Sequence, residues 1–97
     1  MWVRLAFARI TPELLPETRR IFNNEIAPKV KQKKGNKDFL FLENSTEKGE
    51  IIILFAWKTK EDYLEFEAGG LYQELTEKLR NRATGGFTLK TYEVVDQ

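Results

Sequence analysis

The sequence contains neither cysteine nor histidine. Without cysteine the chain has no disulfide bonds, thiolate nucleophiles or cysteine-based metal sites. Without histidine it lacks the usual general base near neutral pH, the Ser-His-Asp triad and the commonest protein ligand of zinc and haem. The missing imidazole is the most informative absence in the composition.

The chain also lacks a marked charge imbalance and a long hydrophobic run. Sixteen Lys and Arg residues against fifteen Asp and Glu residues give a net charge of +1, whereas nucleic-acid binders usually carry a clustered basic excess. The longest apolar run, residues 51–57, is far shorter than the ~20 residues of a spanning helix. Arg4 and Arg9 interrupt any signal-peptide-like stretch at the N-terminus. We expect a soluble, cytoplasmic protein with no membrane or nucleic-acid partner.

The length of 97 residues fits one domain, which we expect over residues 1–97. A domain of this size buries only ~60–65% of the surface of its unfolded chain. Its core is therefore thin, and a partner subunit would help to cover it.

Hydrophobic periodicity predicts the first half of the chain as a strand followed by a helix. The alternate residues of a strand at 2–10 divide into two sets, Val3, Leu5 and Phe7 on one face and Trp2, Arg4, Ala6 and Ala8 on the other. Pro16 suits a first helical turn, so the helix begins near residue 15 and ends before Gly35. Its apolar stripe has helical spacing and comprises Leu15, Phe22, Ile26 and Val30. We expect Pro28 to kink or break its last turns.

The second half predicts two strands, two helices and a final strand. Strands at residues 37–44 and 51–58 flank a polar hairpin loop. Thr59 caps the next helix, with Asp62 in the capping-box position. After a break at residues 69–70, a helix over 71–82 turns Leu71, Leu75 and Leu79 inward, residues 84–86 form a loop, and residues 87–95 form the last strand. The order is β-α-β-β-α-β, a ferredoxin-like α+β fold in which an antiparallel sheet carries its helices on one face.

The second and third predicted strands are apolar on both faces. Antiparallel strands with one wet face alternate apolar and polar residues, but residues 39–42 are Phe-Leu-Phe-Leu and residues 51–57 are apolar throughout. Because the helices cover one face only, the other would expose a contiguous apolar patch, which usually marks an interface. Covering several hundred Å² contributes on the order of 10 kcal/mol before association costs. We expect a homodimer formed through the open sheet face.

Residues 55–79, FAWKTKEDYLEFEAGGLYQELTEKL, resemble the antibiotic biosynthesis monooxygenase-like proteins, a family of dimeric α/β barrels. The family pattern is a strand ending in Trp, a Ser/Thr cap, an acidic helix start, an aromatic residue, a short break and a second amphipathic helix. These features correspond here to Trp57, Thr59, Glu61-Asp62, Tyr63, Gly69-Gly70 and residues 71–79. Residues 25–36 resemble the end of the family's first helix.

The resemblance implies a homodimer with a cleft between helices and sheet in each subunit. Several members oxidise polycyclic phenols with oxygen and no cofactor, and a branch degrades haem. The haem branch has an Asn near Ala8 and a His near Thr76, of which this sequence has neither, so we do not expect haem degradation. The Asn that some oxygenases place before the Trp corresponds to Ile53, which counts against their chemistry also.

We expect an aromatic ligand to contact a pocket lined by Trp57, Tyr63, Phe22, Phe66 and Tyr72, with no cofactor, no metal and no assigned catalytic residue. Each aromatic residue has a plainer alternative role in core packing. The lysines at positions 29–37 are better explained by the dipole of a helix C-terminus than by an anion site.

Three functions remain open at this point. One is a cofactor-independent oxygenase of an aromatic or polycyclic substrate, and another is a non-catalytic, small-molecule-binding or stress-related homodimer of the same fold. An RNA-recognition module shares the element order, but Lys48-Gly49 is followed by aliphatic residues rather than the aromatics that such modules need. Whether the protein is an enzyme is left undecided by the sequence.

Overall fold

The elements follow one another in the predicted order. The computed structural model describes residues 1–95, so the last two residues of the expected 1–97 domain lie outside the described part. The elements are β1 (Trp2–Ile10), the 3-10 turn η1 (Pro12–Leu14), α1 (Leu15–Arg20), the π-helical η2 (Ile21–Ile26), α2 (Ala27–Lys31), β2 (Asn36–Glu43), β3 (Glu50–Trp57), α3 (Lys60–Glu67), α4 (Gly70–Arg82) and β4 (Ala83–Glu93). The first strand is confirmed, and β2 and β3 each lie one residue earlier than predicted.

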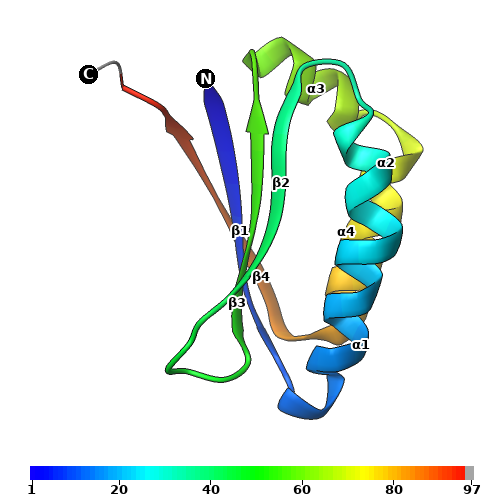
Figure 1. Cartoon of the computed structure of the whole chain (residues 1–97), viewed down its shortest axis with the longest axis vertical. Helices are drawn as coiled ribbons and strands as arrows, with labels where there is room; N and C mark the ends of the chain where they lie inside the picture. Colours follow the sequence, from blue (N-terminus) through cyan, green and yellow to red (C-terminus); the bar gives the residue numbers. More distant parts are fainter. Residues whose placement is uncertain (96–97) are drawn as a thin grey trace.

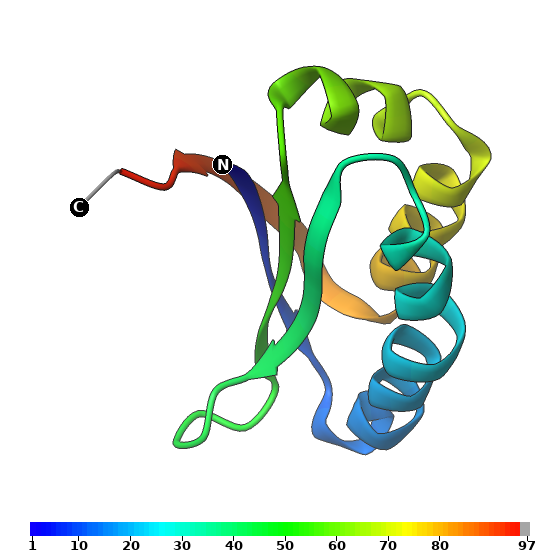
Figure 2. The ribbon, with the colours of Figure 1, turned by 45° about the horizontal axis from the view of Figure 1, so that its top comes forward.

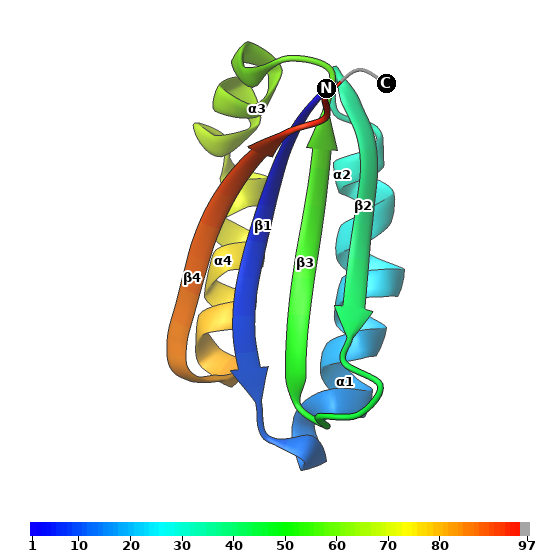
Figure 3. The same cartoon turned by 90° about the vertical axis from the view of Figure 1, so that its left-hand side faces the viewer.

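The strands form one antiparallel sheet in the order β2-β3-β1-β4. The helices lie on one face of this sheet (Figure 1), and Figure 3 shows the opposite face with the helices behind it. Figure 2 shows α3 following β3 at one end of the sheet before the chain turns sharply into α4. The predicted ferredoxin-like α+β fold is confirmed. None of the described helices combines the length and the apolar character that a membrane crossing requires.

The first helical segment runs from α1 through η2 to α2, and its hydrogen bonding changes before Pro28. The N–H of Ala27 donates to the carbonyl of Phe22, five residues back, as in a π turn. Pro28 has no N–H for the regular bond four residues back, so a wider turn ahead of it accommodates the proline. The predicted interruption near Pro28 is confirmed, and the predicted apolar stripe is buried.

A glycine turn after the first helical segment and a threonine cap on α3 lie where the sequence predicts them. Gly35 has a φ of +79°, which favours glycine, and its carbonyl accepts from the N–H of Lys58 at 2.7 Å. The Thr59 hydroxyl oxygen accepts from the N–H of Asp62 at 3.1 Å and caps α3. These bonds join the end of the first helical segment, the end of β3 and the start of α3.

The predicted loop at residues 84–86 is wrong, because these residues belong to β4. Ala8 pairs with Phe87 and Ile10 pairs with Ala83, so residues 84–86 oppose Arg9 alone. Gly85 and Gly86 have φ values of +78° and +82°, so the extra residues form a bulge inside the strand. The glycine pair bends the chain without ending the strand. β4 therefore starts four residues earlier than predicted and ends at Glu93 rather than residue 95.

The face of the sheet beneath the helices forms the hydrophobic core. Trp2, Ala6, Ala8 and Ile10 of β1 are buried beside alternate residues of the neighbouring strands, namely Phe39, Ile51, Ile53, Phe55 and Trp57. The helices contribute their predicted stripes, of which Leu75 and Leu79 are buried and Leu71 is half-buried. Arg4 is the charged residue among the inward positions of β1.

The opposite face of the sheet is apolar over β2, β3 and β1, carries Thr88 and Lys90 on β4, and is covered by none of the described elements (Figure 3). Two cross-strand rows dominate it, Leu40–Leu54–Leu5 and Leu42–Ile52–Phe7. Leu40 and Leu42 on the edge strand are 40% and 39% exposed. The prediction that both faces of the central strands carry large apolar side chains is therefore confirmed. We call these residues, with Val3, the outer face.

Three glycine substitutions separate backbone strain from steric overlap. A Cβ on Gly35 would lie 2.1 Å from Oδ2 of Asp62, whereas one on Gly85, at nearly the same φ, would meet nothing within 4 Å. We expect Gly35→Ala to lower the free energy of unfolding by at least about 2 kcal/mol and Gly85→Ala by about 1 kcal/mol. Gly70→Ala, which has an ordinary φ and open space, should be neutral or stabilising. Urea denaturation tests the order, and equal losses for Gly35→Ala and Gly85→Ala would contradict it.

Candidate functional site

A small internal cavity lies between the sheet and the last two helices. Its walls come from β1, β3, β4, α3 and α4, and comprise Arg4, Ala6, Ile53, Phe55, Tyr63, Tyr72, Leu75, Thr76, Leu79, Phe87 and Leu89. Its volume is about 10 Å³, which is at most room for one water molecule. The side chains therefore nearly fill this space, and a ligand of any size must displace some of them.

Four of the five aromatic residues expected in the pocket come together beside this cavity. The rings of Trp57 and Phe66 are 4.9 Å apart, and Tyr72 lies 6.4 Å from Tyr63 and 5.7 Å from Phe66. Tyr63 and Tyr72 line the cavity itself. Trp57 is fully buried, and its Nε1 has no hydrogen-bond partner among residues 1–95. We call these four residues the aromatic cluster.

Phe22, the fifth expected pocket residue, lies elsewhere in the core. It comes from η2 and packs against Phe39 and Phe41 of β2, with ring centroids 6.5 and 5.6 Å apart. The structure thus places it under the first helical segment, away from the residues that line the cavity. Its role as a ligand contact stays a prediction, as do the roles of the other four residues.

A polar group adjoins the aromatic cluster and was missed in the sequence-based prediction. An Arg4 terminal nitrogen (NH1) donates to the Tyr63 hydroxyl at 3.2 Å, and that hydroxyl donates to Oε2 of Glu67 at 2.7 Å. The same Arg4 nitrogen lies 3.6 Å from the Glu67 oxygen. The strand pattern did contain an indication, since it placed a lone arginine on the same face as Trp2 and Ala6. We call Arg4, Tyr63 and Glu67 the polar triad.

Tyr63 is held in its neutral form by its surroundings. Burial raises the pKa of Tyr63 well above its usual value, and the hydrogen bond to Glu67 adds to the rise. The phenol is therefore a hydrogen-bond donor at every physiological pH. It can orient an oxygen atom of a ligand, but it cannot serve as a general base.

The residues around the cavity do not fit haem. The sequence has no histidine to hold iron, and Thr76 lines the cavity where the haem-degrading branch is expected to have one. Tyrosine ligates haem iron as a phenolate, whereas Tyr63 retains its proton. Among residues 1–95 no three acidic side chains converge as a metal site would require.

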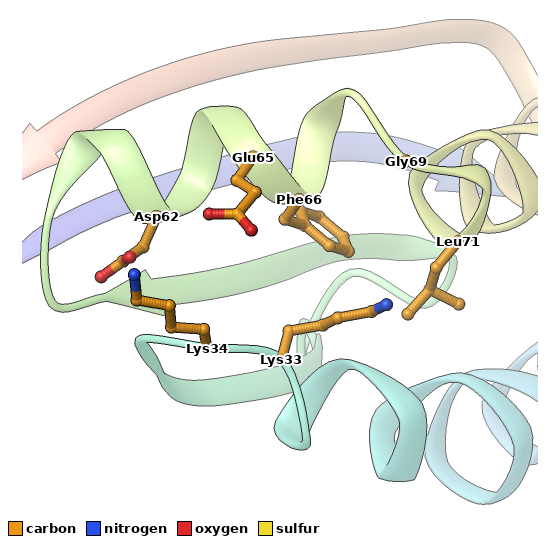
Figure 4. Close-up of a pocket in the computed structure, with 7 residues that line it drawn as sticks. All are labelled: Lys33, Lys34, Asp62, Glu65, Phe66, Gly69 and Leu71. Atoms are coloured by element: carbon orange, nitrogen blue, oxygen red, sulfur yellow. The ribbon is translucent and has the colours of Figure 1, made fainter.

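A second hollow opens at the surface on the far side of Phe66 (Figure 4). It has a volume of about 160 Å³ and is lined by Lys33, Lys34, Asp62, Glu65, Phe66, Gly69 and Leu71. Figure 4 shows Phe66 between the two sides of this hollow, with lysines from one segment facing carboxylates from α3. Opposite charges balance there, so the hollow does not select a ligand of one sign.

The comparisons with known proteins place this fold among solved structures. No family model matches the sequence, and no curated protein matches it. A protein from Deinococcus radiodurans named "putative antibiotic biosynthesis monooxygenase" is 17% identical, with a TM-score of 0.86 over 100% of this chain and 95% of its own. An antibiotic biosynthesis monooxygenase is 14% identical, with a TM-score of 0.83 over 99% of this chain and 100% of its own.

The haem degrader MhuD from Mycobacterium tuberculosis also matches, in a structure with two haems bound in its active site. It is 20% identical, with a TM-score of 0.79 over 100% of this chain and 98% of its own. Likeness at these identities concerns the fold. The chain has the fold of the antibiotic biosynthesis monooxygenase-like proteins, and the resemblance carried by residues 55–79 is confirmed at that level.

The raised pKa of Tyr63 predicts a specific loss of stability in alkali. The folded pKa lies above the value of about 10 in the unfolded chain, so this stabilisation is complete below pH ~10 and declines as the pH rises further. We expect the free energy of unfolding to fall less steeply above pH 10 in Tyr63→Phe than in the wild type. Urea denaturation between pH 8 and pH 11 measures both slopes.

Tyr92→Phe, at an exposed position on β4, is the control for removing a phenol. The interpretation fails if Tyr63→Phe retains the full wild-type dependence on pH.

Proposed function

We propose that this protein binds a flat aromatic or polycyclic molecule between α3, α4 and the sheet, and oxidises it with molecular oxygen without a cofactor. The observation that carries the proposal is the aromatic cluster beside the cavity, in which Tyr63 offers a neutral phenol donor. Ligand sites are mostly apolar, with a few convergent polar groups. Solved structures of this fold named antibiotic biosynthesis monooxygenases support the same reading.

The polar triad supplies the groups that such a reaction needs. Tyr63 would donate a hydrogen bond to the ketone or phenol oxygen of the substrate, where charge develops when the substrate loses a proton. Glu67, released from the Tyr63 hydroxyl when that hydroxyl donates to the substrate instead, would take that proton. For an anthrone, the methylene carbon then loses two hydrogens and gains one oxygen atom from O₂, and the second oxygen atom leaves as water. Exclusion of water from the closed site would favour this course.

The site must open before a ligand can enter, and the corner between α3 and α4 offers the place. Phe66 and Tyr72 flank Gly69 and Gly70 in the sequence, so movement at this corner shifts both aromatic walls. A Cβ on Gly70 would meet nothing within 4 Å, and one on Gly69 would meet only the carbonyl oxygen of Phe66, at 3.4 Å. The corner is thus loosely packed on its outer side.

A second candidate function is binding without chemistry, in a small-molecule-binding or stress-related dimer of the same fold. The small volume of the cavity and the absence of histidine and cysteine favour it. Oxygen consumption separates the two candidates, because a binder shifts its melting temperature with ligand yet consumes no oxygen.

The test of the main proposal is oxygen uptake with a panel of anthrones and hydroquinones. We expect at least one compound to be oxidised with one O₂ consumed per quinone formed from an anthrone. Tyr63→Phe should lower kcat/KM by about tenfold to a hundredfold, because it removes one donor to the developing oxyanion. Tyr92→Phe, which removes a phenol at an exposed position on β4, is the matched control. Stabilisation by several compounds with no uptake for any of them would favour the binding function instead.

The proposed assembly is a homodimer in which two outer faces pack against each other. The sheet has four strands. At about 4.8 Å between strands, and with about eight residues per strand at about 3.3 Å per residue, its face measures roughly 19 by 26 Å. With the relief of its side chains, this face approaches the ~800 Å² per partner of a standard interface. Its central rows are leucine, isoleucine and phenylalanine, which is the composition of a buried interface core rather than of a free surface.

We expect sedimentation equilibrium to give a dimer at micromolar concentration. Leu54→Glu places a charge between Leu40 and Leu5 at the centre of the outer face and should raise the dimer dissociation constant by at least about a hundredfold. Gln73→Glu adds the same charge on the helix side and should remain dimeric. A stable, well-ordered wild-type monomer at this concentration would overturn the assembly.

A further inference from the structure

Arg4 is an internal cation on the core face of the sheet. It projects from the central strand β1, and its side chain is only 20% exposed. Its guanidinium carbon lies 5.3 Å from the ring centre of Trp2 and 4.8 Å from that of Tyr63. Aromatic faces attract a cation and replace part of its hydration. The guanidinium group is therefore fixed in place beside the cavity that Arg4 and Tyr63 both line.

The hydrogen bonding of this guanidinium is incomplete. One terminal nitrogen donates to the Tyr63 hydroxyl and lies 3.6 Å from Oε2 of Glu67, a loose ion pair. The Nε–H is buried and has no acceptor among residues 1–95. A buried donor without an acceptor is unfavourable, and a guanidinium group binds a carboxylate best through two parallel hydrogen bonds. Glu67 does not form two parallel hydrogen bonds with this guanidinium.

We propose that Arg4 recognises a carboxylate on the aromatic ligand through its free Nε edge and that the charge of Glu67, on the other edge, partly neutralises Arg4 while the protein is empty. A ligand carboxylate that accepts from Nε and from the second terminal nitrogen, on the edge of the guanidinium away from Tyr63 and Glu67, would satisfy the buried donor. The aromatic part of the ligand would then extend along Tyr63 and Tyr72 into the cavity. This inference rests on the proposed function, because it defines the chemical class of the ligand bound at the same site.

Weakening of the Arg4–Glu67 ion pair also connects recognition with opening of the site. Glu67 is the last residue of α3 and stands two residues before the Gly69-Gly70 corner. While Glu67 contacts Arg4 and Tyr63, it fastens the end of α3 to the sheet. A second carboxylate on the same guanidinium weakens the Arg4–Glu67 contact, so the end of α3 is held less tightly beside the aromatic wall that must move, while Glu67 stays next to Tyr63. Ligands without the anion have to open the site against this contact.

Two probes that differ only in charge test the proposal, 2-naphthoate and its neutral isostere 2-naphthamide. Isothermal titration calorimetry should show that the wild type binds the carboxylate at least about tenfold more tightly than the amide. Arg4→Met retains a flexible apolar side chain against Trp2 and Tyr63, and should bind both probes equally and weakly. Glu67→Gln should bind 2-naphthoate several-fold more tightly than the wild type, because the competing charge is gone.

Arg9→Met is the matched control, since Arg9 lies on the same strand, is exposed and pairs with Glu50. It should keep the wild-type preference. Equal binding of the two probes by the wild type, or a preference that survives in Arg4→Met, overturns the role of Arg4 and leaves the proposed function standing. Failure of both probes to bind overturns the proposed site together with this inference. If circular dichroism shows that Arg4→Met is unfolded, Glu67→Gln against wild type decides, and unchanged affinity for 2-naphthoate refutes the proposal.

Discussion

The main constraint on this molecule is that its central strands are apolar on both faces while its helices cover one. The first helical segment, α3 and α4 all pack on the inner face. The core that they form with the sheet is thin but closely packed. The rows Leu40–Leu54–Leu5 and Leu42–Ile52–Phe7 remain outside it. No rearrangement of the same elements would remove this excess, because sequential residues of a strand point to opposite sides. Packing within one chain therefore leaves apolar side chains exposed on the outer face.

The candidate site lies on the inner face. Its aromatic side chains fill the space between helices and sheet so completely that the cavity beside Tyr63 and Tyr72 is about 10 Å³. A charged residue in such a place needs compensation, and Arg4 obtains it from two ring faces, one phenol and one carboxylate. The polar triad is thus both a means of tolerating a half-buried cation and the chemically distinctive part of the fold.

Hydrophobic periodicity and helix-end residues predicted much of the fold, whereas the sequence predicted the candidate site only in part. The alternation in β1, the stripe of the first helical segment and the Thr59 cap are local patterns, so the sequence displays them directly. The start of β4 was predicted wrongly because glycine pairs occur in bulges and loops alike. The pairing of Ala8 with Phe87 and of Ile10 with Ala83 decides between them. The aromatic cluster was predicted, but the polar triad joins residues about sixty positions apart, a proximity that no local pattern encodes.

The bulge at Gly85 and Gly86 has a consequence for how copies of this chain can meet. β4 is an edge strand, and a regular edge exposes backbone donors and acceptors along its length, which invites another strand to extend the ladder. Two successive residues with positive φ interrupt that row near the start of β4 and add local twist. Open-ended strand pairing along this edge is thereby discouraged.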